Sequence, residues 1–209
     1  KSIDHVITDP PYSEHVHAKG RKGASLTVNK SNQRKILATE RDLGFASLTP
    51  EMLATCAEHF ARLARRWSLV FSDVESCHLW RAAMVDEGLE YVRTAFWHKQ
   101  GGAPQFTGDR PAVACETITL CHPSGRKAWN GRGKLGIYTV PIVVPRVGPR
   151  HPEAEERIHT TQKPVKLMRQ LVADFTVVDD LILDPFAGSG TTLVAALEQG
   201  RRAIGVELD

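Results

Sequence analysis

The 209-residue sequence predicts an α/β protein built on a doubly wound, mostly parallel sheet. Strand-like apolar segments at 67–71, 91–97 and 181–183 alternate with segments whose apolar residues recur at helical spacing. The hydrophobic content of 42% and the charged content of 24% are ordinary for one globular domain, which we place at residues 1–209. In sheets of this kind ligands bind beyond the carboxyl ends of the strands, so functional motifs are expected there.

Local signals set the boundaries of the expected elements. Residues 3–8 form a strand that ends at two consecutive prolines, which cannot donate to a ladder. Thr49 and Pro50 suit the start of a helix, and Gly88 suits the end of the next one. Residues 13–48 are polar and basic and are expected to form a long loop. The other expected elements are strands at 67–71, 91–97, 116–121, 181–183 and 203–206, and helices at 74–87, 164–175 and 191–199.

Basic residues gather in two islands. The chain carries a net charge of +3, yet residues 13–41 alone carry +5 and residues 123–152 carry +6, which leaves −8 on the remainder. Two basic islands on an acidic body are typical of localised phosphate binding. Two solvated loops would give the same pattern, so charge alone does not decide between these interpretations.

Other features narrow the class of protein. No run approaches the ~20 apolar residues that a membrane-spanning helix needs, and no charged and then apolar leader begins the sequence. We therefore expect a cytoplasmic protein with no membrane partner. The four cysteines at 56, 77, 115 and 121 form no Cys-x-x-Cys pair, which predicts free thiols and no metal site.

A glycine-rich turn, from Asp184 to Thr192, follows the expected strand at 181–183. Glycines let backbone N–H groups approach a ligand, and Glu207, at the end of the next strand, is suited to accept both hydroxyls of a ribose. A dinucleotide site would need a third glycine where Leu193 stands, and a P-loop would need a lysine directly after Gly190. The turn therefore predicts a ribose-bearing cofactor of another kind, with a purely structural turn as the alternative.

The tetrapeptide Asp9-Pro10-Pro11-Tyr12 combines a carboxylate, a carbonyl freed from sheet pairing and an aromatic face. Asp9 and the Pro10 carbonyl can each accept one N–H of an exocyclic amino group, while Tyr12 stacks on the ring. These parts suit a flat base as the substrate. A proline-capped strand end with an exposed tyrosine is the alternative.

Together these motifs resemble those of the amino-methyltransferases that modify adenine N6 or cytosine N4 in DNA, in the permuted order with the catalytic motif ahead of the cofactor motif. The segment Thr161-Gln162-Lys163-Pro164 is similar to the family segment that folds against the methionine part of the cofactor. Trp97-His98-Lys99 is similar to a strand end near the family's base pocket. The resemblance implies a Rossmann-like methyltransferase fold.

The resemblance also assigns roles to residues of this sequence. It places catalysis on Asp9, Pro10, Pro11 and Tyr12. It places S-adenosylmethionine binding on Thr161, Gln162, Lys163, Asp184, Phe186, Gly188, Gly190, Thr191, Thr192 and Glu207. From the basic islands we expect nucleic-acid binding by Lys19, Arg21, Lys22, Arg34, Lys35, Arg126, Lys127, Arg132 and Lys134.

The two basic islands receive separate expectations. Residues 123–152 are the candidate target-recognition segment, with Trp129, Asn130 and Tyr138 as base contacts. Residues 13–41 are expected to clamp phosphates or close over the flipped base.

The sequence thus predicts an S-adenosylmethionine-dependent methyltransferase that acts on N6 of a flipped adenine at a specific sequence in double-stranded DNA, as in bacterial or phage restriction–modification. Asp9 favours adenine, because the cytosine-N4 motif more often begins with serine. Cytosine N4, RNA, a protein glutamine and a silent nucleic-acid-binding domain stay as alternatives, and a homodimer is left open. The family's strand before the catalytic motif and its helix after the acidic strand have no counterpart here, so the domain is expected to be incomplete in this chain.

Overall fold

The computed structural model describes residues 2–12, 47–102, 108–143 and 162–208, and the backbone of residues 22–28 and 34–40. One seven-stranded sheet dominates, with the strand order β7-β5-β6-β4-β1-β8-β9. Only β6 runs antiparallel to its neighbours within this sheet. The mostly parallel α/β fold is therefore confirmed. The strands are β1 (His5–Thr8), β4 (Ser68–Ser72), β5 (Glu90–Gln100), β6 (Cys115–His122), β7 (Ile137–Pro141), β8 (Leu181–Asp184) and β9 (Arg202–Gly205).

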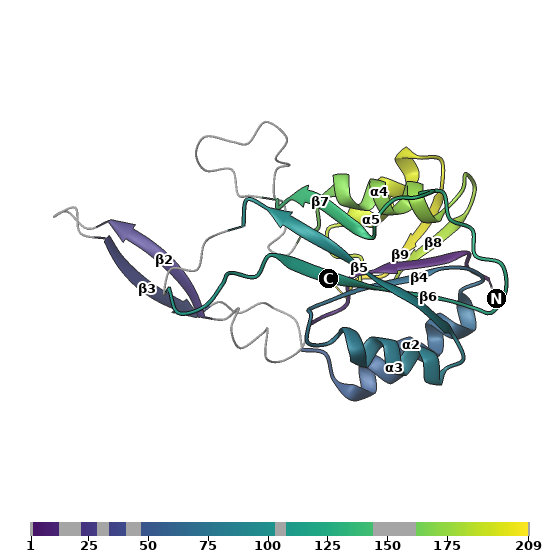
Figure 1. The fold of residues 1–209 in the computed structure, drawn as a ribbon, viewed down its shortest axis with the longest axis horizontal. Helices are drawn as coiled ribbons and strands as arrows, with labels where there is room; N and C mark the ends of the chain where they lie inside the picture. The colour runs from purple at the N-terminus through teal and green to yellow at the C-terminus, as the bar shows by residue number, and fades with distance from the viewer. Residues whose placement is uncertain are drawn as a thin grey trace.

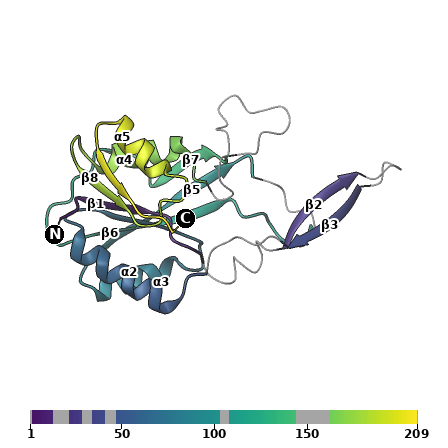
Figure 2. The same cartoon turned by 180° about the vertical axis from the view of Figure 1, so that it is seen from behind.

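Helices cover both faces of the sheet (Figure 1). The pair α2 (Pro50–Leu63) and α3 (Cys77–Asp86) lies on one face, and the pair α4 (Val165–Phe175) and α5 (Thr191–Glu198) lies on the other, as the view from behind also shows (Figure 2). Because successive strand residues point to opposite faces, Val6 packs in the core beneath α2 and α3 while Ile7 packs beneath α4 and α5. None of the helices that the structure describes is long and apolar enough to cross a membrane.

The local start and stop signals of the helices are confirmed. Thr49 is the N-cap of α2 and its side chain accepts a hydrogen bond from Met52 N at 3.1 Å, with Pro50 in the first turn. Gly88, with a φ of 83°, follows α3 in the left-handed conformation that ends many helices. These devices act within a few residues, which is why the sequence reveals them.

Two predictions about irregular segments are wrong. Within the expected loop at 13–48, β2 (Lys22–Val28) pairs with β3 (Arg34–Glu40) as an antiparallel hairpin outside the main sheet. The edge strand β7 lies in the basic stretch at 123–152, where no strand was expected. In both places the alternation of apolar and polar residues is short and is interrupted by basic residues or flanked by glycine. This weakens the alternating pattern by which a sequence indicates a strand.

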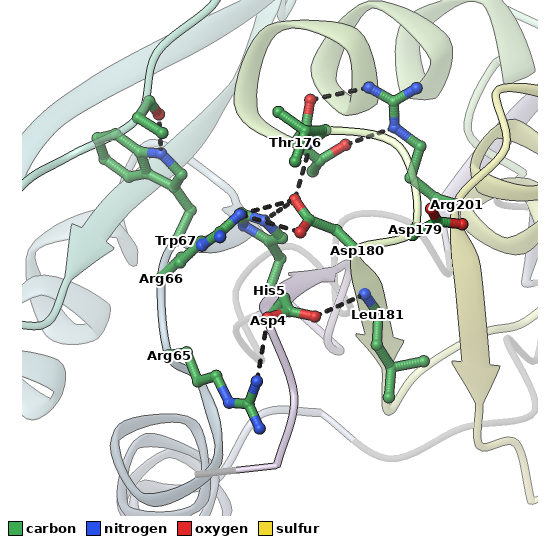
Figure 3. A network of polar contacts seen from close by, with 12 residues as sticks. Asp4, His5, Arg65, Arg66, Trp67, Thr176, Asp179, Asp180, Leu181 and Arg201 are labelled. Carbon is green, nitrogen blue, oxygen red and sulfur yellow. Dashed lines mark hydrogen bonds and ion pairs between the residues drawn. The ribbon is translucent and has the colours of Figure 1, made fainter.

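A polar network ties the strands together at the amino edge of the sheet (Figure 3). The Asp180 carboxylate lies 2.9 Å from His5 Nε2 of β1 and accepts hydrogen bonds from Arg66 at 2.9 and 3.1 Å. Val177 N donates to the same carboxylate at 2.8 Å. Burial lowers the pKa of His5, so the ring is neutral at physiological pH. The network therefore fixes the amino ends of β1 and β8 relative to each other, far from the predicted motifs at the carboxyl ends.

Candidate active site

Three parallel strands bring the predicted motifs to one edge. Strand β1 lies beside β8, with Val6 paired to Leu183, and β8 lies beside β9, with Asp184 paired to Gly205. Asp9, the glycine turn and Glu207 follow the ends of these strands, so they lie at the same edge of the sheet. The convergence expected from the sequence is therefore present in the structure.

The Asp9 carboxylate has one bound oxygen and one free oxygen. Its Oδ2 accepts a hydrogen bond from Lys163 Nζ at 2.5 Å, whereas the buried Oδ1 has no hydrogen-bond partner in the part of the chain that the structure describes. Burial raises the pKa of Asp9, and the Lys163 charge opposes that rise. A buried unpaired carboxylate oxygen is a strong acceptor for a substrate N–H.

The Tyr12 side chain is held by its hydroxyl. That hydroxyl donates to Glu116 Oε2 at 2.7 Å and accepts from Lys163 Nζ at 3.1 Å. Burial raises the pKa of Tyr12 well above its ordinary value, so the phenol stays protonated. The backbone carbonyl of Tyr12 accepts from Leu48 N at 3.0 Å, which joins the end of the Asp9–Tyr12 segment to the segment before α2. The orientation of the ring is therefore fixed before any substrate arrives.

Glu116, the second residue of β6, is a site residue that the sequence motifs did not reveal. Its carboxylate lies 2.5 Å from Lys99 Nζ and 3.1 Å from Lys163 Nζ, and the residue is only 8% exposed. Burial favours the neutral form of Glu116, but the charges of Lys163 and Lys99 outweigh it and lower the pKa to about 2. Trp97 of β5 pairs with Glu116 of β6. The motif at 97–99 would therefore predict Glu116 as a site residue only if the pairing of these two strands were known.

Lys163 differs in its observed contacts from the role that the resemblance implied. Its ammonium contacts Asp9 and Glu116, and lies 5.2 Å from the centroids of the Tyr12 and Phe71 rings. The preceding Gln162 is partly buried, and Thr161 lies outside the described residues. The segment thus reaches the strand-end site, where Lys163 contacts Asp9 and Tyr12.

Asp184 supports the glycine turn from within. The residue is 3% exposed, and its Oδ1 accepts from Thr8 Oγ1 at 2.7 Å and from Phe186 N at 3.1 Å. Burial raises the pKa of Asp184 to about 6, while hydrogen bonds from Thr192 and Thr8 act in the opposite direction. Thr191 and Thr192 are also buried. These three predicted cofactor residues therefore shape the turn from inside.

The surface of the turn remains open for a cofactor. Gly188 and Gly190 have φ values of 49° and 76°, and an added Cβ at Gly190 would meet nothing within 4 Å. The exposed Glu207 accepts from Gly188 N at 2.5 Å and from Leu208 N at 3.0 Å. An open glycine face with a carboxylate at its edge fits the ribose of S-adenosylmethionine, with the Glu207 oxygens as hydroxyl acceptors.

The described part of the second basic island lies away from the strand-end site. The basic residues of segment 126–134 come after His122, the last residue of β6. His122 pairs with Glu90 at the edge of the sheet opposite Asp9. There Lys127 forms an ion pair with Glu90 at 2.5 Å, and Lys134 pairs with Asp174 at 2.8 Å. The structure thus does not bring Arg126, Lys127, Arg132 or Lys134 to the strand-end site. Lys22, Arg34 and Lys35 belong to the hairpin, and Lys19 and Arg21 lie outside the described residues.

One of the three expected base contacts in the second island, Tyr138, is wrong. Tyr138 is 1% exposed, and its hydroxyl donates to Asp174 at 3.0 Å. The Asn130 amide donates to the carbonyls of Ala173 at 3.0 Å and Thr176 at 2.8 Å, where it caps α4. The Trp129 ring packs on Phe175 at a centroid distance of 4.8 Å, and its Nε1 donates to the Arg132 carbonyl. Tyr138 is therefore a core residue, whereas base contacts by Trp129 and Asn130 stay predictions.

Comparisons with known proteins agree with this geometry. The family described as DNA methylase matches residues 3–209. The Escherichia coli (strain K12) protein called "Putative methylase YubD" is 56% identical over 211 residues, covering 99% of this chain and 77% of that protein. The type II methyltransferase M2.MboI of Moraxella bovis is 51% identical over 218 residues, covering 99% and 76%.

A solved structure shares the fold. The crystal structure of the M1.HpyAVI–SAM complex superposes with a TM-score of 0.65 at 20% identity, covering all of this chain and 84% of that chain. The chain belongs to the N6/N4 DNA methylase family and is a DNA methyltransferase.

Proposed function

We propose that the methyl acceptor is the N6 amino group of an adenine flipped out of double-stranded DNA. The observation that carries this proposal is Asp9 Oδ1, which is buried and has no hydrogen-bond partner among the described residues. It follows β1 at the edge where the glycine turn and Glu207 also lie. An exocyclic amino group placed there would satisfy an otherwise costly buried acceptor.

The chain's contribution to catalysis is mainly positioning. S-adenosylmethionine supplies an electrophilic methyl carbon on a positively charged sulfur. The adenine amine is a weak nucleophile because its lone pair is delocalised into the ring. Hydrogen bonds from the amine to Asp9 Oδ1 and to the Pro10 carbonyl favour a pyramidal nitrogen with its lone pair aimed at the methyl carbon. If the amine attacked that carbon, the new N–C bond would replace the C–S bond, and the proton released from the amine would go to Asp9 or to water.

Tyr12 provides the surface for the flipped base. Its hydroxyl is fixed by Glu116 and Lys163, so little side-chain entropy remains to be lost when a base stacks on the ring. Flipping costs on the order of a few kcal/mol, and stacking on an aromatic ring offsets part of it. A fixed tyrosine therefore suits an enzyme whose substrate must be extracted from a duplex.

The place of the first basic island in the chain favours a role of this island in binding DNA. The hydrogen bond between Leu48 N and Tyr12 O closes the base of the segment at 13–46, so this segment leaves and re-enters the fold at the catalytic motif. The segment contains Lys19, Arg21, Lys22, Arg34 and Lys35. Its position in the chain favours phosphate contacts beside the flipped base, whereas the island at 126–134 lies at the opposite edge.

The catalytic role of Asp9 can be tested with unmethylated plasmid DNA and methyl-labelled S-adenosylmethionine. Asp9→Ala should lower methyl transfer by at least about 1,000-fold, within the range for a residue that handles the proton and orients the nucleophile. Cofactor affinity measured by calorimetry should stay within about threefold, because Asp9 contacts the base and not the ribose. The exposed Asp86→Ala is the control, and activity retained in Asp9→Ala would refute the role.

A further inference from the structure

We propose that Lys163 and Glu116 are positioning residues for methyl transfer, which fix Asp9 and Tyr12 in the orientation that the target base meets. The inference rests on the proposed catalytic role of Asp9. It gives Lys163 a function distinct from the contact with the methionine part of the cofactor that the resemblance implied. It also brings Glu116, a residue outside the sequence motifs, into the active site.

The hydrogen-bonding capacity of Lys163 is fully used within the site. An ammonium group has three N–H donors. Lys163 Nζ has three acceptors in reach, namely Asp9 Oδ2 at 2.5 Å, Tyr12 OH at 3.1 Å and Glu116 Oε2 at 3.1 Å. Its side chain is 8% exposed. In this arrangement the ammonium has no donor left for a base or a cofactor, so its effect is exerted through Asp9 and Tyr12.

Glu116 anchors the opposite side of the same cluster. Its Oε2 accepts the Tyr12 hydroxyl at 2.7 Å and faces Lys163, while its Oε1 lies 2.5 Å from Lys99 Nζ. Two carboxylates and two ammonium groups thus neutralise one another. Such pairing is what permits buried charges to persist, because an isolated buried carboxylate would take up a proton.

Aromatic rings enclose the charged cluster. The rings of Tyr12, Phe71 and Trp97 have centroids 5.2, 5.2 and 5.9 Å from Lys163 Nζ. They limit access of water, which strengthens the electrostatic attraction between Lys163 and Asp9. Asp9 Oδ2 is consequently committed to Lys163, and Oδ1 stays free as the acceptor for the target amine.

The same types of side chain form a second cluster at the carboxyl end of α4, the helix whose amino end follows Lys163. Asp174 accepts from Lys134 Nζ at 2.8 and 2.9 Å and from Tyr138 OH at 3.0 Å, and it is 6% exposed. Asp174→Asn therefore removes a buried carboxylate from a lysine and a tyrosine without touching the strand-end site. It is a matched control for Glu116→Gln.

The experiment compares Lys163→Met, Glu116→Gln and Asp174→Asn, with unmethylated plasmid DNA as substrate at a series of pH values. Lys163→Met should lower kcat by about 100-fold near neutral pH, as expected when a reacting group is misplaced by about 1 Å. Part of this loss should be recovered as the pH rises, because Asp9 without its ammonium partner ionises only at higher pH. Glu116→Gln, which keeps an acceptor for Tyr12, should lower kcat by about tenfold.

The controls separate positioning from structural and cofactor-binding roles. The KM for S-adenosylmethionine should stay within about threefold in both variants, and Asp174→Asn should keep kcat within about twofold. The inference is overturned if Lys163→Met retains the parent kcat, loses activity by the same factor at every pH, or acts only through the KM for S-adenosylmethionine. If thermal unfolding shows that Lys163→Met does not fold, Glu116→Gln decides, and a parent-like kcat and pH profile overturns the inference.

The two proposals fail in different ways. If Asp9→Ala stays active, the catalytic role of Asp9 is wrong. If Asp9→Ala is inactive and both Lys163→Met and Glu116→Gln are fully active, only the positioning role is wrong.

Discussion

Asp184 is a buried carboxylate whose ionisation opposes the stability of the fold. Burial raises its pKa to about 6 from an ordinary value of 3.8. Since the native state then binds the proton more tightly than the unfolded chain, the stabilising contribution is full below pH 3.8 and is lost as the pH rises through about 6. A shift of this size corresponds to about 3 kcal/mol in the free energy of unfolding. The carboxylate that accepts the hydrogen bonds shaping the glycine turn is thus partly destabilising at neutral pH.

Replacing Asp184 with asparagine should remove this pH dependence. The side-chain carbonyl of the asparagine can still accept from Thr8 and Phe186 N, but the side chain no longer ionises. Between about pH 4 and pH 7, the variant should therefore gain about 3 kcal/mol in unfolding free energy relative to the parent. Urea unfolding at several pH values measures this difference. Curves that run parallel for the two proteins would contradict the expectation.

At the scale of elements, the glycine turn depends on the close approach of β9. An added Cβ at Gly205 would lie 2.8 Å from Leu193 Cδ2 and 2.9 Å from Ala187 Cβ. The leucine side chain can rotate, but Ala187 belongs to the turn itself and can move only with the backbone. The space at Gly205 therefore determines where the glycine turn lies.

Gly205→Ala should displace the turn and weaken cofactor binding. We expect a loss of about 1 to 3 kcal/mol in unfolding free energy, as for other overpacked sites. The affinity for S-adenosylmethionine should fall by about tenfold, because the turn and Glu207 would no longer keep their spacing. Gly133→Ala is the control, since a Cβ there meets nothing within 4 Å. Parent-like affinity in calorimetry of Gly205→Ala would show that the turn does not depend on this approach.

The elements that the sequence predicted correctly are those with local signals. The start of α2 rests on Thr49 and Pro50, which lie next to each other, and the turn after β8 rests on glycines within one short segment. The strand β7 and the β2–β3 hairpin were missed because their alternation is short and mixed with basic residues. Local chemistry specifies helix ends and turns more strongly than it specifies weak edge strands.

The same reasoning explains which site residues were found. Asp9 and Tyr12 belong to one contiguous motif, so their proximity follows from the chain itself. Glu116 reaches them only because β6 runs antiparallel to β5 and starts at the catalytic edge. The sequence predicts a base contact for Tyr138 because this residue lies in a basic segment. The same local sequence is compatible with a tyrosine that faces DNA and with one that packs, as here, in the core. Long-range pairing, which a single sequence does not display, accounts for both errors.

At the scale of the whole molecule, the two edges of the sheet have different tasks. The amino edge holds the buried network of His5, Arg66 and Asp180. The carboxyl edge holds the open glycine turn, the free oxygen of Asp9 and the charged cluster around Lys163. Strand β8 runs from one edge to the other and lies beside β1. A rigid sheet of this kind can set the distance between the glycine turn and Asp9, the proposed cofactor site and the proposed base acceptor.

The most direct test of the central claim is the identity of the methylated base. Unmethylated duplex DNA is incubated with the protein and methyl-labelled S-adenosylmethionine, digested to nucleosides and separated by chromatography. The account predicts label in N6-methyldeoxyadenosine, and none above background with Asp9→Ala. Label in N4-methyldeoxycytidine, or undiminished labelling with Asp9→Ala, would contradict it.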